Sequence, residues 1–400
     1  MITTKHFRRT ADFLGLKRNI VFLLSLTMIM LTGEKLWDRF LPKYLDGIGA
    51  STLVIGGLGF LQNILNAFWA LPGGYLSDKL GHRKSLFVFN IMAVIGYTIA
   101  ILFTNWIAVF IGMIFFSAWG AVSLPASMSL ITDTLKYSKT AMGISMHSIV
   151  RRIPMAIGPI IGGILITTLG LISGIKTAFA ASIVLCLIGM IFQWRIKSAA
   201  VEAYESLHPL TLWKRIDPRL KNLLVSDILI RFCEQIPYVF VVIWCLDVLH
   251  VSPEKFGLLT AIEMMTAALL YIPVASFSDR MERKPFVIIT FIFFTIFPVI
   301  LYFSNSFATL CIAFFVRGLK EFGEPTRKAI ILDLSPKNAK ARAYGLYYFI
   351  RDFVVAFAAL LGGWLWYYSP AINFFTATAF GIIGTLLFLL YGKSSSTSHN

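Results

Sequence analysis

Charged side chains lie deep inside long apolar stretches of this 400-residue sequence, and their spacing is the first sign of chemistry. In the stretch 19–42, Glu34 and Asp38 are four residues apart, and so are Lys35 and Arg39. This spacing places each pair on one face of a helix. A charge among apolar helices is costly unless it is paired or faces water. We therefore expect these groups to meet partners, an ion or a polar solute.

Two further stretches carry charges of both signs at helical spacing. Residues 221–249 contain Arg231 and Glu234. Residues 306–333 contain a charge every three or four positions, which predicts a stripe along one face of a single helix, formed by Arg317, Lys320, Glu321, Glu324 and Arg327. Such a stripe must face water or partners.

Proton transfer is the first chemistry that this pattern indicates. Burial favours the protonated form of a carboxyl group, and a nearby Arg favours the ionised form, so an acid whose Arg partner comes and goes can load and release a proton. We predict Glu34 as the first candidate proton carrier, then Glu234 and Glu321, and then Asp38 and Glu324. Glu263 either faces a cavity or meets a neighbouring hydroxyl or Arg, and His147 either titrates or packs.

Binding of an organic solute is the second chemistry. Guanidinium groups can hold a carboxylate or phosphate, and aromatic rings, which make up 14% of the residues, can stack on flat molecules. The predicted substrate-binding residues are Arg151, Arg152, Arg231, Arg317, Arg351, Lys35, Trp37, Trp119, Tyr238 and Tyr347.

The elements that carry these groups are predicted to be membrane-spanning helices. The sequence is 57% hydrophobic and 14% charged, with a mean hydropathy of +0.76, which excludes a soluble globule, a disordered chain and a disulfide-stapled module. Each span needs about 20 apolar residues. We predict an all-α integral membrane protein with twelve transmembrane helices, at residues 19–42, 52–77, 85–103, 107–133, 141–169, 174–194, 221–249, 255–277, 285–303, 306–333, 341–368 and 370–391.

A long polar segment divides the chain into two halves of six helices. We predict an N-terminal bundle at residues 1–195, a cytoplasmic central loop at 196–219 and a C-terminal bundle at 220–400. An internal repeat with an offset of 200 or 201 residues relates the halves, since it pairs Asp78 with Asp279, Pro125 with Pro325, Arg151 with Arg351 and Gly162 with Gly362. Two bundles of the same build enclose a space, as in transporters with parallel repeats.

The net charge of +16 is mostly explained by topology. With the amino terminus inside, 23 of the 36 Lys and Arg residues fall in cytoplasmic segments, three fall outside and ten fall within spans. We predict a multi-pass protein of the bacterial inner (plasma) membrane with both termini cytoplasmic, and we exclude nucleic acid as a partner.

The four Cys residues lack ligand spacing, and no HExxH, phosphate-binding loop or nucleophile elbow occurs, so we predict no metal, no cofactor and no enzymatic activity.

The motif GYLSDKLGHRKS between the second and third predicted helices resembles the loop signature of the major facilitator superfamily. The second copy, ASFSDRMERKPF, keeps the charges but has Ala275 and Glu282 where glycines are usual. The resemblance implies the two-bundle fold of that superfamily and an inner gate that breaks as the transporter changes state. The residues that match the gate are Gly74, Asp78, Gly81, Arg83, Lys84, Asp279, Arg280 and Arg283, with Lys284 beside them.

Two further comparisons with the superfamily concern coupling and direction. The superfamily often has an Arg in its fourth helix, where this chain has Phe116, and the repeat places Arg317 at the matching position. GPIIGG at residues 158–163 is similar to part of the signature of drug/proton antiporters, although Pro154 and Ser145 replace its upstream glycines. Glycines at this spacing also simply let helices approach closely.

The resemblance implies a secondary active transporter that works by alternating access as a monomer in the lipid bilayer, with a small-molecule substrate and a proton as partners. Proton-coupled efflux of a drug, a metabolite or a siderophore-like compound is the leading hypothesis. Proton-coupled uptake of an anionic or zwitterionic nutrient is the alternative, because Arg151, Arg317 and Arg351 could hold an anion. A lipid flippase is an alternative of another class.

Overall fold

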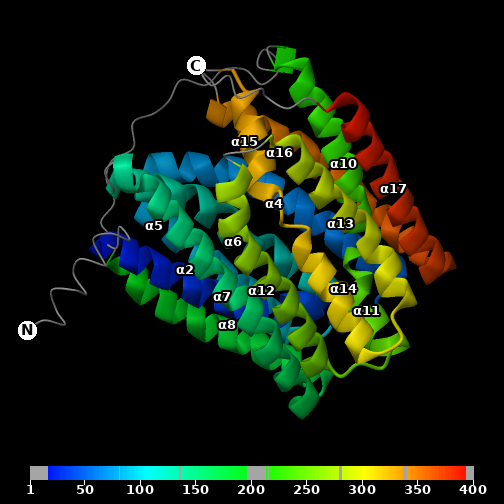
Figure 1. Ribbon diagram of the computed structural model, residues 1–400. Helices are drawn as coiled ribbons and strands as arrows, with labels where there is room; N and C mark the ends of the chain where they lie inside the picture. Colours follow the sequence, from blue (N-terminus) through cyan, green and yellow to red (C-terminus); the bar gives the residue numbers. More distant parts are fainter. Residues whose placement is uncertain are drawn as a thin grey trace, which may run out of the picture. The chain divides into compact units, whose positions relative to one another are not determined.

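The computed structural model describes residues 17–80, 82–134, 137–195, 213–214, 216–278, 282–336 and 340–392, which are mostly helical (Figure 1). The helices of the first half are α2 (Arg18–Trp37), η1 (Asp38–Phe40), α3 (Leu41–Gly47), α4 (Thr52–Leu80), α5 (His82–Leu102), α6 (Trp106–Thr134), α7 (Tyr137–Leu169) and α8 (Leu171–Trp194). Those of the second half are α10 (Pro218–Tyr238), α11 (Phe240–Ile243), η2 (Trp244–Val248), α12 (Pro253–Ser278), α13 (Lys284–Phe303), α14 (Phe307–Leu319), α15 (Glu324–Asp333), α16 (Lys340–Tyr368) and α17 (Pro370–Tyr391).

The predicted spans correspond in order to these helices. Eight of the helices among the described residues are long and apolar enough to cross a membrane, and α10 with the segment 240–248 adds a ninth if this pair, bent by 40°, is one span. An apolar segment must satisfy its backbone hydrogen bonds internally when it lies in lipid, and a helix does this. The prediction of an all-α integral membrane protein is confirmed.

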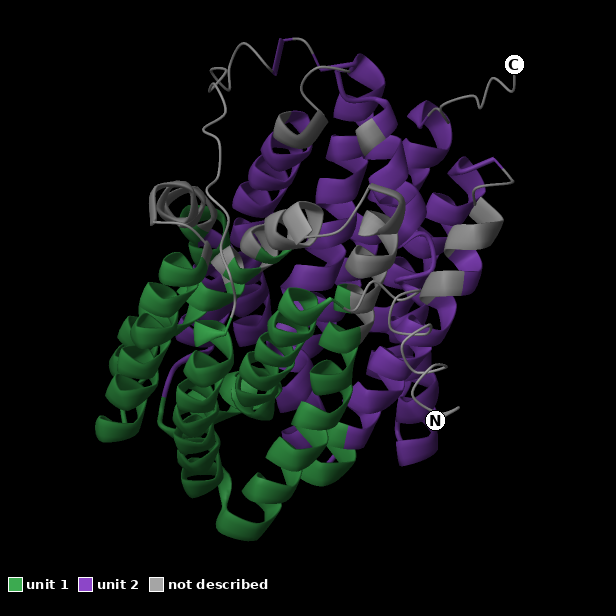
Figure 2. Cartoon of the chain, turned by 90° about the vertical axis from the view of Figure 1, so that its left-hand side faces the viewer, with its two compact units in different colours: residues 1–49, 65–204, 252–257 green, residues 50–64, 205–251, 258–400 purple. Residues whose placement is uncertain are grey.

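The chain forms two compact units, which we describe separately (Figure 2). Unit 1 contains residues 1–49, 65–204 and 252–257, and unit 2 contains residues 50–64, 205–251 and 258–400. The first part of α4 therefore belongs to unit 2, and the first residues of α12 belong to unit 1. The three-part domain division expected from the polar segment remains a prediction.

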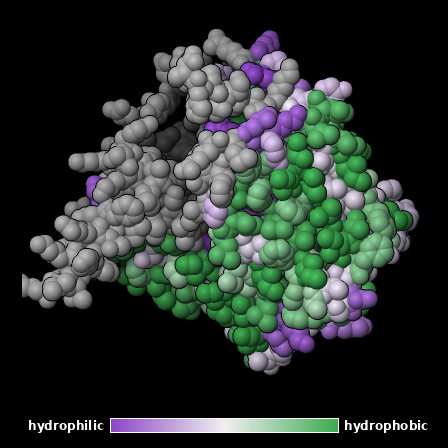
Figure 3. Space-filling view, in the orientation of Figure 1, coloured by the Kyte–Doolittle hydropathy of each residue, from purple (hydrophilic) through white to green (hydrophobic). Residues whose placement is uncertain are grey.

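Apolar side chains cover the outer face of unit 2 along α13 and α14, as the green area of Figure 3 shows. Exposed residues there include Ile292, Ile312 and Phe315, each more than two-fifths exposed. A soluble protein rarely exposes so large an apolar area, whereas a membrane protein presents it to lipid tails.

Close helix packing at equivalent glycines repeats within the two units. In unit 1, a Cβ added at Gly162 of α7 would overlap the carbonyl oxygen of Leu36 in α2. In unit 2, a Cβ added at Gly362 of α16 would overlap the carbonyl oxygen of Ile236 in α10. Both partners are offset by 200 residues, so the repeat found in the sequence is also a repeat of backbone contacts.

The same correspondence holds for a second glycine pair. A Cβ on Gly257, at the start of α12, would overlap the carbonyl oxygen of Pro159 in α7, and one on Gly56 of α4 would lie 2.8 Å from the carbonyl oxygen of Ala359 in α16. Helix packing therefore accounts for glycines in GPIIGG and for their counterparts in the second half. The antiporter interpretation of this motif remains a prediction.

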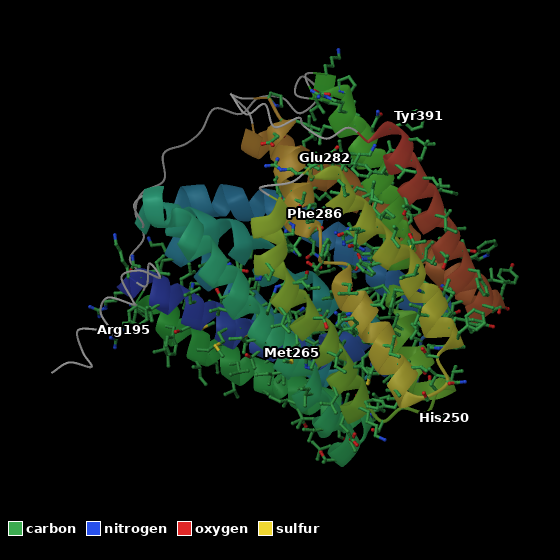
Figure 4. All side chains as sticks on the ribbon, in the orientation of Figure 1. Arg195, His250, Met265, Glu282, Phe286 and Tyr391 are labelled. Atoms are coloured by element: carbon green, nitrogen blue, oxygen red, sulfur yellow. The ribbon has the colours of Figure 1, made fainter. Side chains whose placement is uncertain are left out.

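The prediction of one continuous helix over residues 306–333 is wrong. Residues 320–323 form a turn between α14 and α15, with tight backbone hydrogen bonds from Glu321 to Gly318 and from Phe322 to Leu319. Pro325 stands in the first turn of α15, where its missing N–H is tolerated. At Gly323, a side chain would overlap the carbonyl oxygen of Phe286, which is labelled at the start of α13 in Figure 4.

Candidate functional site

Three charged residues line one face of α10 in unit 2. Asp227, Arg231 and Glu234 are spaced by four and three residues, so they follow one another along the helix. Arg231 Nη1 lies 2.6 Å from Glu234 Oε2, and Arg231 Nε lies 3.9 Å from Asp227 Oδ1. Asp227 is almost completely buried, whereas the side chain of Glu234 is 11% exposed.

Helices α12 and α14 add the next charges. Glu263 of α12 is fully buried, and its Oε1 lies 3.2 Å from Arg317 Nε and 3.2 Å from Lys320 Nζ. Lys320 Nζ also lies 2.8 Å from Glu234 Oε1, so it joins α12 to α10. Lys320 stands just after the last residue of α14, at the break in the tenth span. The break therefore presents its ammonium group to both acids.

Helix α15 continues the contacts beyond the break. Glu324 accepts hydrogen bonds from Arg327 at 2.6 and 3.0 Å, and its Oε2 lies 3.5 Å from Arg231 Nη2. Arg327 also forms an ion pair with Asp227 and is almost completely buried. An arginine can serve two carboxylates because its guanidinium group presents five N–H donors in one plane.

Helix α16 provides the last members. Arg351 Nη1 lies 3.7 Å from Asp227 Oδ2, and its Nη2 lies 2.6 Å from Asp352 Oδ1. The hydroxyl of Tyr347 donates a 3.0 Å hydrogen bond to Asp227, and the guanidinium group of Arg351 lies 4.2 Å from the ring centre of Tyr348. Asp227 is thus held from α15 and α16 as well as from α10.

These residues form one unbroken chain of alternating charges, which we call the charge chain. Every neighbouring pair is within 4.0 Å in the order Arg317, Glu263, Lys320, Glu234, Arg231, Glu324, Arg327, Asp227, Arg351 and Asp352. It contains five cations and five acids, so it is neutral as a whole. It begins at Arg317 and fully buried Glu263 and ends at Asp352, whose side chain is 33% exposed.

A smaller charged group lies on α2 and η1 in unit 1. Lys35 Nζ lies 2.6 Å from Glu34 Oε1 and 2.8 Å from Asp38 Oδ2. Arg151 of α7 is half-buried and close enough to Glu34 for the two charges to interact. Lys35 thus pairs with both acids of this group, and their predicted roles in proton coupling remain a prediction.

The fourth-helix position that the repeat pairs with Arg317 is filled by an aromatic cluster. The ring of Phe116 lies 5.0 Å from that of Tyr97 in a stacked arrangement and 4.9 Å from that of Trp37. In unit 2, Arg317 lies over the ring of Phe297 at 5.0 Å, which the repeat pairs with Tyr97. The two units share a packing scheme, but only unit 2 places a charge at this point.

Comparison with known proteins identifies the family. The profile of the Major Facilitator Superfamily matches residues 19–218 and 223–400. The chain belongs to this superfamily. It is therefore a multi-pass membrane transporter and not an enzyme. An uncharacterized MFS-type transporter of Methanocaldococcus jannaschii is 25% identical, over 92% of this chain and 94% of that protein.

Solved structures of other superfamily transporters share its fold. A mutant of the nucleoside transporter NupG superposes with a TM-score of 0.80 at 16% identity, covering 94% of this chain and 100% of that one. The peptide transporter POT, solved in complex with sulfate, gives a TM-score of 0.76 at 12% identity, covering 94% of this chain and 93% of that one. A D-xylose–proton symporter gives a TM-score of 0.72 at 14% identity, covering 94% of this chain and 97% of that one.

The structure brings most predicted site residues of the second half together. Glu234, Glu324, Arg231, Arg317 and Arg351 all belong to the charge chain, Tyr347 contacts it, and the ring of Tyr238 lies 5.6 Å from the guanidinium group of Arg317. Glu321 is half-buried in the turn after α14, where its charge acts on Lys320.

The predicted site residues of the first half are placed differently. Arg152 is half-buried on α7, Trp119 is buried in α6, and Trp37 is buried in the aromatic cluster. His147 is also buried. The first half therefore offers fewer charges than the second, and its aromatic candidates are core residues.

Sequence reasoning missed Asp227 as a site residue, although it accepts contacts from three arginines and one tyrosine. It also left the role of Glu263 open and treated Arg327 only as part of a stripe. The signal for Asp227 was its place four residues before Arg231 in an otherwise apolar segment.

Among the described residues, no three His, Cys, Asp or Glu side chains are grouped so as to hold a metal ion.

The predicted gate is described only in part. Gly81, Asp279 and Arg280 lie outside the described residues, and Gly74 and Asp78 lie in the part of α4 whose side chains are not described. Arg283 forms an ion pair with Asp333, and Lys284 donates a 2.9 Å hydrogen bond to the carbonyl oxygen of Leu389. The gating role of these residues remains a prediction.

Proposed function

We propose that this superfamily transporter couples movement of a small organic solute to movement of protons by alternating access. The charge chain carries the proposal. Its carboxylates contact cations on neighbouring helices, so a proton added to one acid changes which helices are held together. Such a local charge change can bias a bistable arrangement of helices.

Glu234 is the acid best placed to exchange a proton. Its two cations each contact a second acid, since Arg231 reaches Glu324 and Lys320 reaches Glu263. Protonation of Glu234 therefore leaves neither cation without a carboxylate. Glu263 differs, because it is the only acid in an ion pair with Arg317 among the described residues. We assign proton exchange to Glu234, with Glu34 as its counterpart in unit 1, and an anchoring role to Glu263.

A solute with a carboxylate or phosphate is favoured by the surplus of positive charge in the spans of unit 1. Glu34 and Asp38 balance Lys35 and Arg39, and α7 adds the half-buried Arg151 and Arg152. Superfamily structures include the peptide transporter solved with sulfate, an anion. We therefore propose an organic anion or zwitterion as substrate rather than a cationic drug. From the distribution of Lys and Arg, we propose that both termini are cytoplasmic and that the protein lies in the inner (plasma) membrane. We also propose that the transporter works as a monomer.

A ligand screen on purified protein tests the substrate class. Organic acids, zwitterions, metal chelates and cationic drugs are compared by thermal shift. A ligand at 100 times its Kd stabilises the folded state by about 2.7 kcal/mol. We expect stabilisation by acids or zwitterions, and Arg151→Gln should remove it. Stabilisation by cationic drugs alone would exclude this substrate class.

Proteoliposomes test the coupling with the ligand that the screen identifies. We expect flux to follow an imposed pH gradient, and its sign gives the direction of transport. Glu234→Gln and Glu34→Gln should each abolish the response to the gradient, because Gln cannot carry the proton. Glu254→Gln is the matched control, since Glu254 lies at the start of α12 outside the charge chain. Equal wild-type flux with and without the gradient would exclude proton coupling.

A further inference from the structure

A cavity of about 300 Å³ lies in unit 1 where α5 begins and α8 ends. It is lined by Arg83, Lys84, Phe87, Val88, Gln193 and Trp194. Arg195, labelled in Figure 4, marks this end of α8. The cavity volume is at the lower end of the range for small-molecule sites.

The lining combines two cations with apolar side chains. The guanidinium group of Arg83 lies 5.7 Å from the ring centre of Trp194, and Lys84 is exposed. Gln193 Nε2 donates a 2.8 Å hydrogen bond to the carbonyl oxygen of Arg83, which ties the end of α8 to the start of α5. Trp194 itself is 67% exposed, although it is the largest apolar side chain of the lining.

The equivalent helix ends in unit 2 also carry cations. There Arg283 pairs with Asp333, and Lys284 donates to the carbonyl oxygen of Leu389 at the end of α17. The repeat thus keeps cations at the equivalent helix ends. In unit 1, Arg83 and Lys84 border the cavity.

Exposed apolar side chains continue from the cavity along both helices. Their spacing of three, four or seven residues places each set on one face, namely Val88, Ile91 and Ile95 on α5 and Ile191, Leu187 and Val184 on α8. All six are more than a third exposed. A ligand with an anionic head and a long apolar tail matches a basic cavity followed by two apolar stripes.

We propose that this cavity binds the headgroup of an anionic phospholipid, with an acyl chain lying along α5 and α8. The phosphate contacts Arg83 and Lys84, and the indole of Trp194 lies at the level of the headgroup, as interfacial Trp residues do. This proposal concerns a lipid site and does not rest on the transport proposal. A phosphate ion alone would not use the apolar stripes.

Native mass spectrometry of the full chain in mild detergent tests the site. The probes are dioleoylphosphatidylglycerol and dioleoylphosphatidylcholine, which share acyl chains and differ in net charge. We expect phosphatidylglycerol to bind more tightly, and Arg83→Gln with Lys84→Gln to raise its Kd about 25-fold, since each cation contributes about fivefold. Trp194→Ala should weaken both lipids, because it removes an apolar contact.

Lys176→Gln is the matched control. Lys176 is a cation of the same helix pair, on α8 but at its other end, and it donates a 2.6 Å hydrogen bond to Thr104 Oγ1. Its replacement should leave phosphatidylglycerol binding unchanged. Equal binding of the two lipids, or an unchanged Kd in the double variant with a thermal unfolding temperature like wild type, would overturn the proposal. Displacement of the lipid by equimolar soluble glycerol phosphate would also overturn it, because the acyl chain would then contribute nothing.

Discussion

The charge chain predicts different costs for two superficially similar substitutions. Glu263→Gln removes the carboxylate that is the ion-pair partner of Arg317, whereas Glu234→Gln removes a carboxylate whose two cations each retain another acid. Both changes replace a carboxylate by an amide of nearly the same shape, and both acids lie in unit 2. The comparison therefore isolates the consequence of leaving a buried guanidinium group unpaired.

The burial of Arg317 gives the expected loss of stability for each variant. Arg317 is only 4% exposed at its side chain and is surrounded by aromatic rings, so it cannot recover its lost partner from water. Breaking a buried ion pair in this way costs about 3–5 kcal/mol. In a unit of roughly 200 residues, about 2–4 °C is lost per kcal/mol, so Glu263→Gln should lower the unfolding temperature by about 6–20 °C. Glu234→Gln should cost less than half as much.

The unfolding temperature of each variant can be measured through its buried thiols. Cys186, Cys233 and Cys245 are at most 3% exposed, so a thiol-reactive fluorophore reports unfolding of detergent-solubilised protein. Adding Arg317→Met to Glu263→Gln should recover most of the loss, because it removes the orphaned charge. Equal unfolding temperatures for the two single variants, or no recovery in the double variant, would refute the account of the charge chain.

Further predictions concern packing, a helix cap and the repeat. Gly162→Ala and Gly362→Ala should each prevent stable folding, because the added methyl group overlaps backbone atoms of a neighbouring helix. Gly345→Ala should instead stabilise the folded protein by about 0.5–1 kcal/mol, because nothing lies within 4 Å of the added methyl group. The yield of monodisperse protein checks all three variants. The hydrogen bond from the Arg219 side chain lowers the pKa of Asp217, the N-cap of α10, below its usual 3.8. Asp217→Ala should therefore cost about 1 kcal/mol above pH 3.8, and the difference in unfolding temperature should shrink as the pH falls through the lowered pKa. Phe116→Arg should lower the unfolding temperature more than Phe116→Leu, because it places a guanidinium group among the rings of Trp37, Tyr97 and Phe179.

Much of the fold could be predicted from hydropathy, because each apolar run long enough to cross a bilayer must form a helix. The expected span 370–391 coincides with α17, and 85–103 differs from α5 by at most three residues. The repeat offset also predicted which glycines are equivalent, although the helices that they contact could not be inferred from spacing alone. Those contacts depend on tertiary packing, which brings Gly162 against Leu36 of α2 and Gly257 against Pro159 of α7.

The break in the tenth span could not be predicted in the same way. Its charges recur at helical spacing, and that periodicity is compatible with one long helix. Gly323 and Pro325 were visible in the sequence, but the close approach of Gly323 to Phe286 is a tertiary contact. Asp227 was missed for a related reason, since a single acid among apolar residues acquires its role only when Arg327 and Arg351 reach it from other helices.

The two units show that one repeat can fix the packing of the helices in both halves while only the second half carries the charge chain. Glycine contacts with backbone are retained in both halves, so the helices approach in the same way whichever side chains surround them. At the paired positions Phe116 and Arg317, the halves then diverge, with an aromatic cluster in unit 1 and the first member of the charge chain in unit 2. Because these glycine contacts are made to backbone atoms, a residue such as Glu234 can change protonation without loss of the close helix approach at the glycines. The proton coupling proposed for unit 2 therefore needs only a re-pairing of side chains that already have second partners.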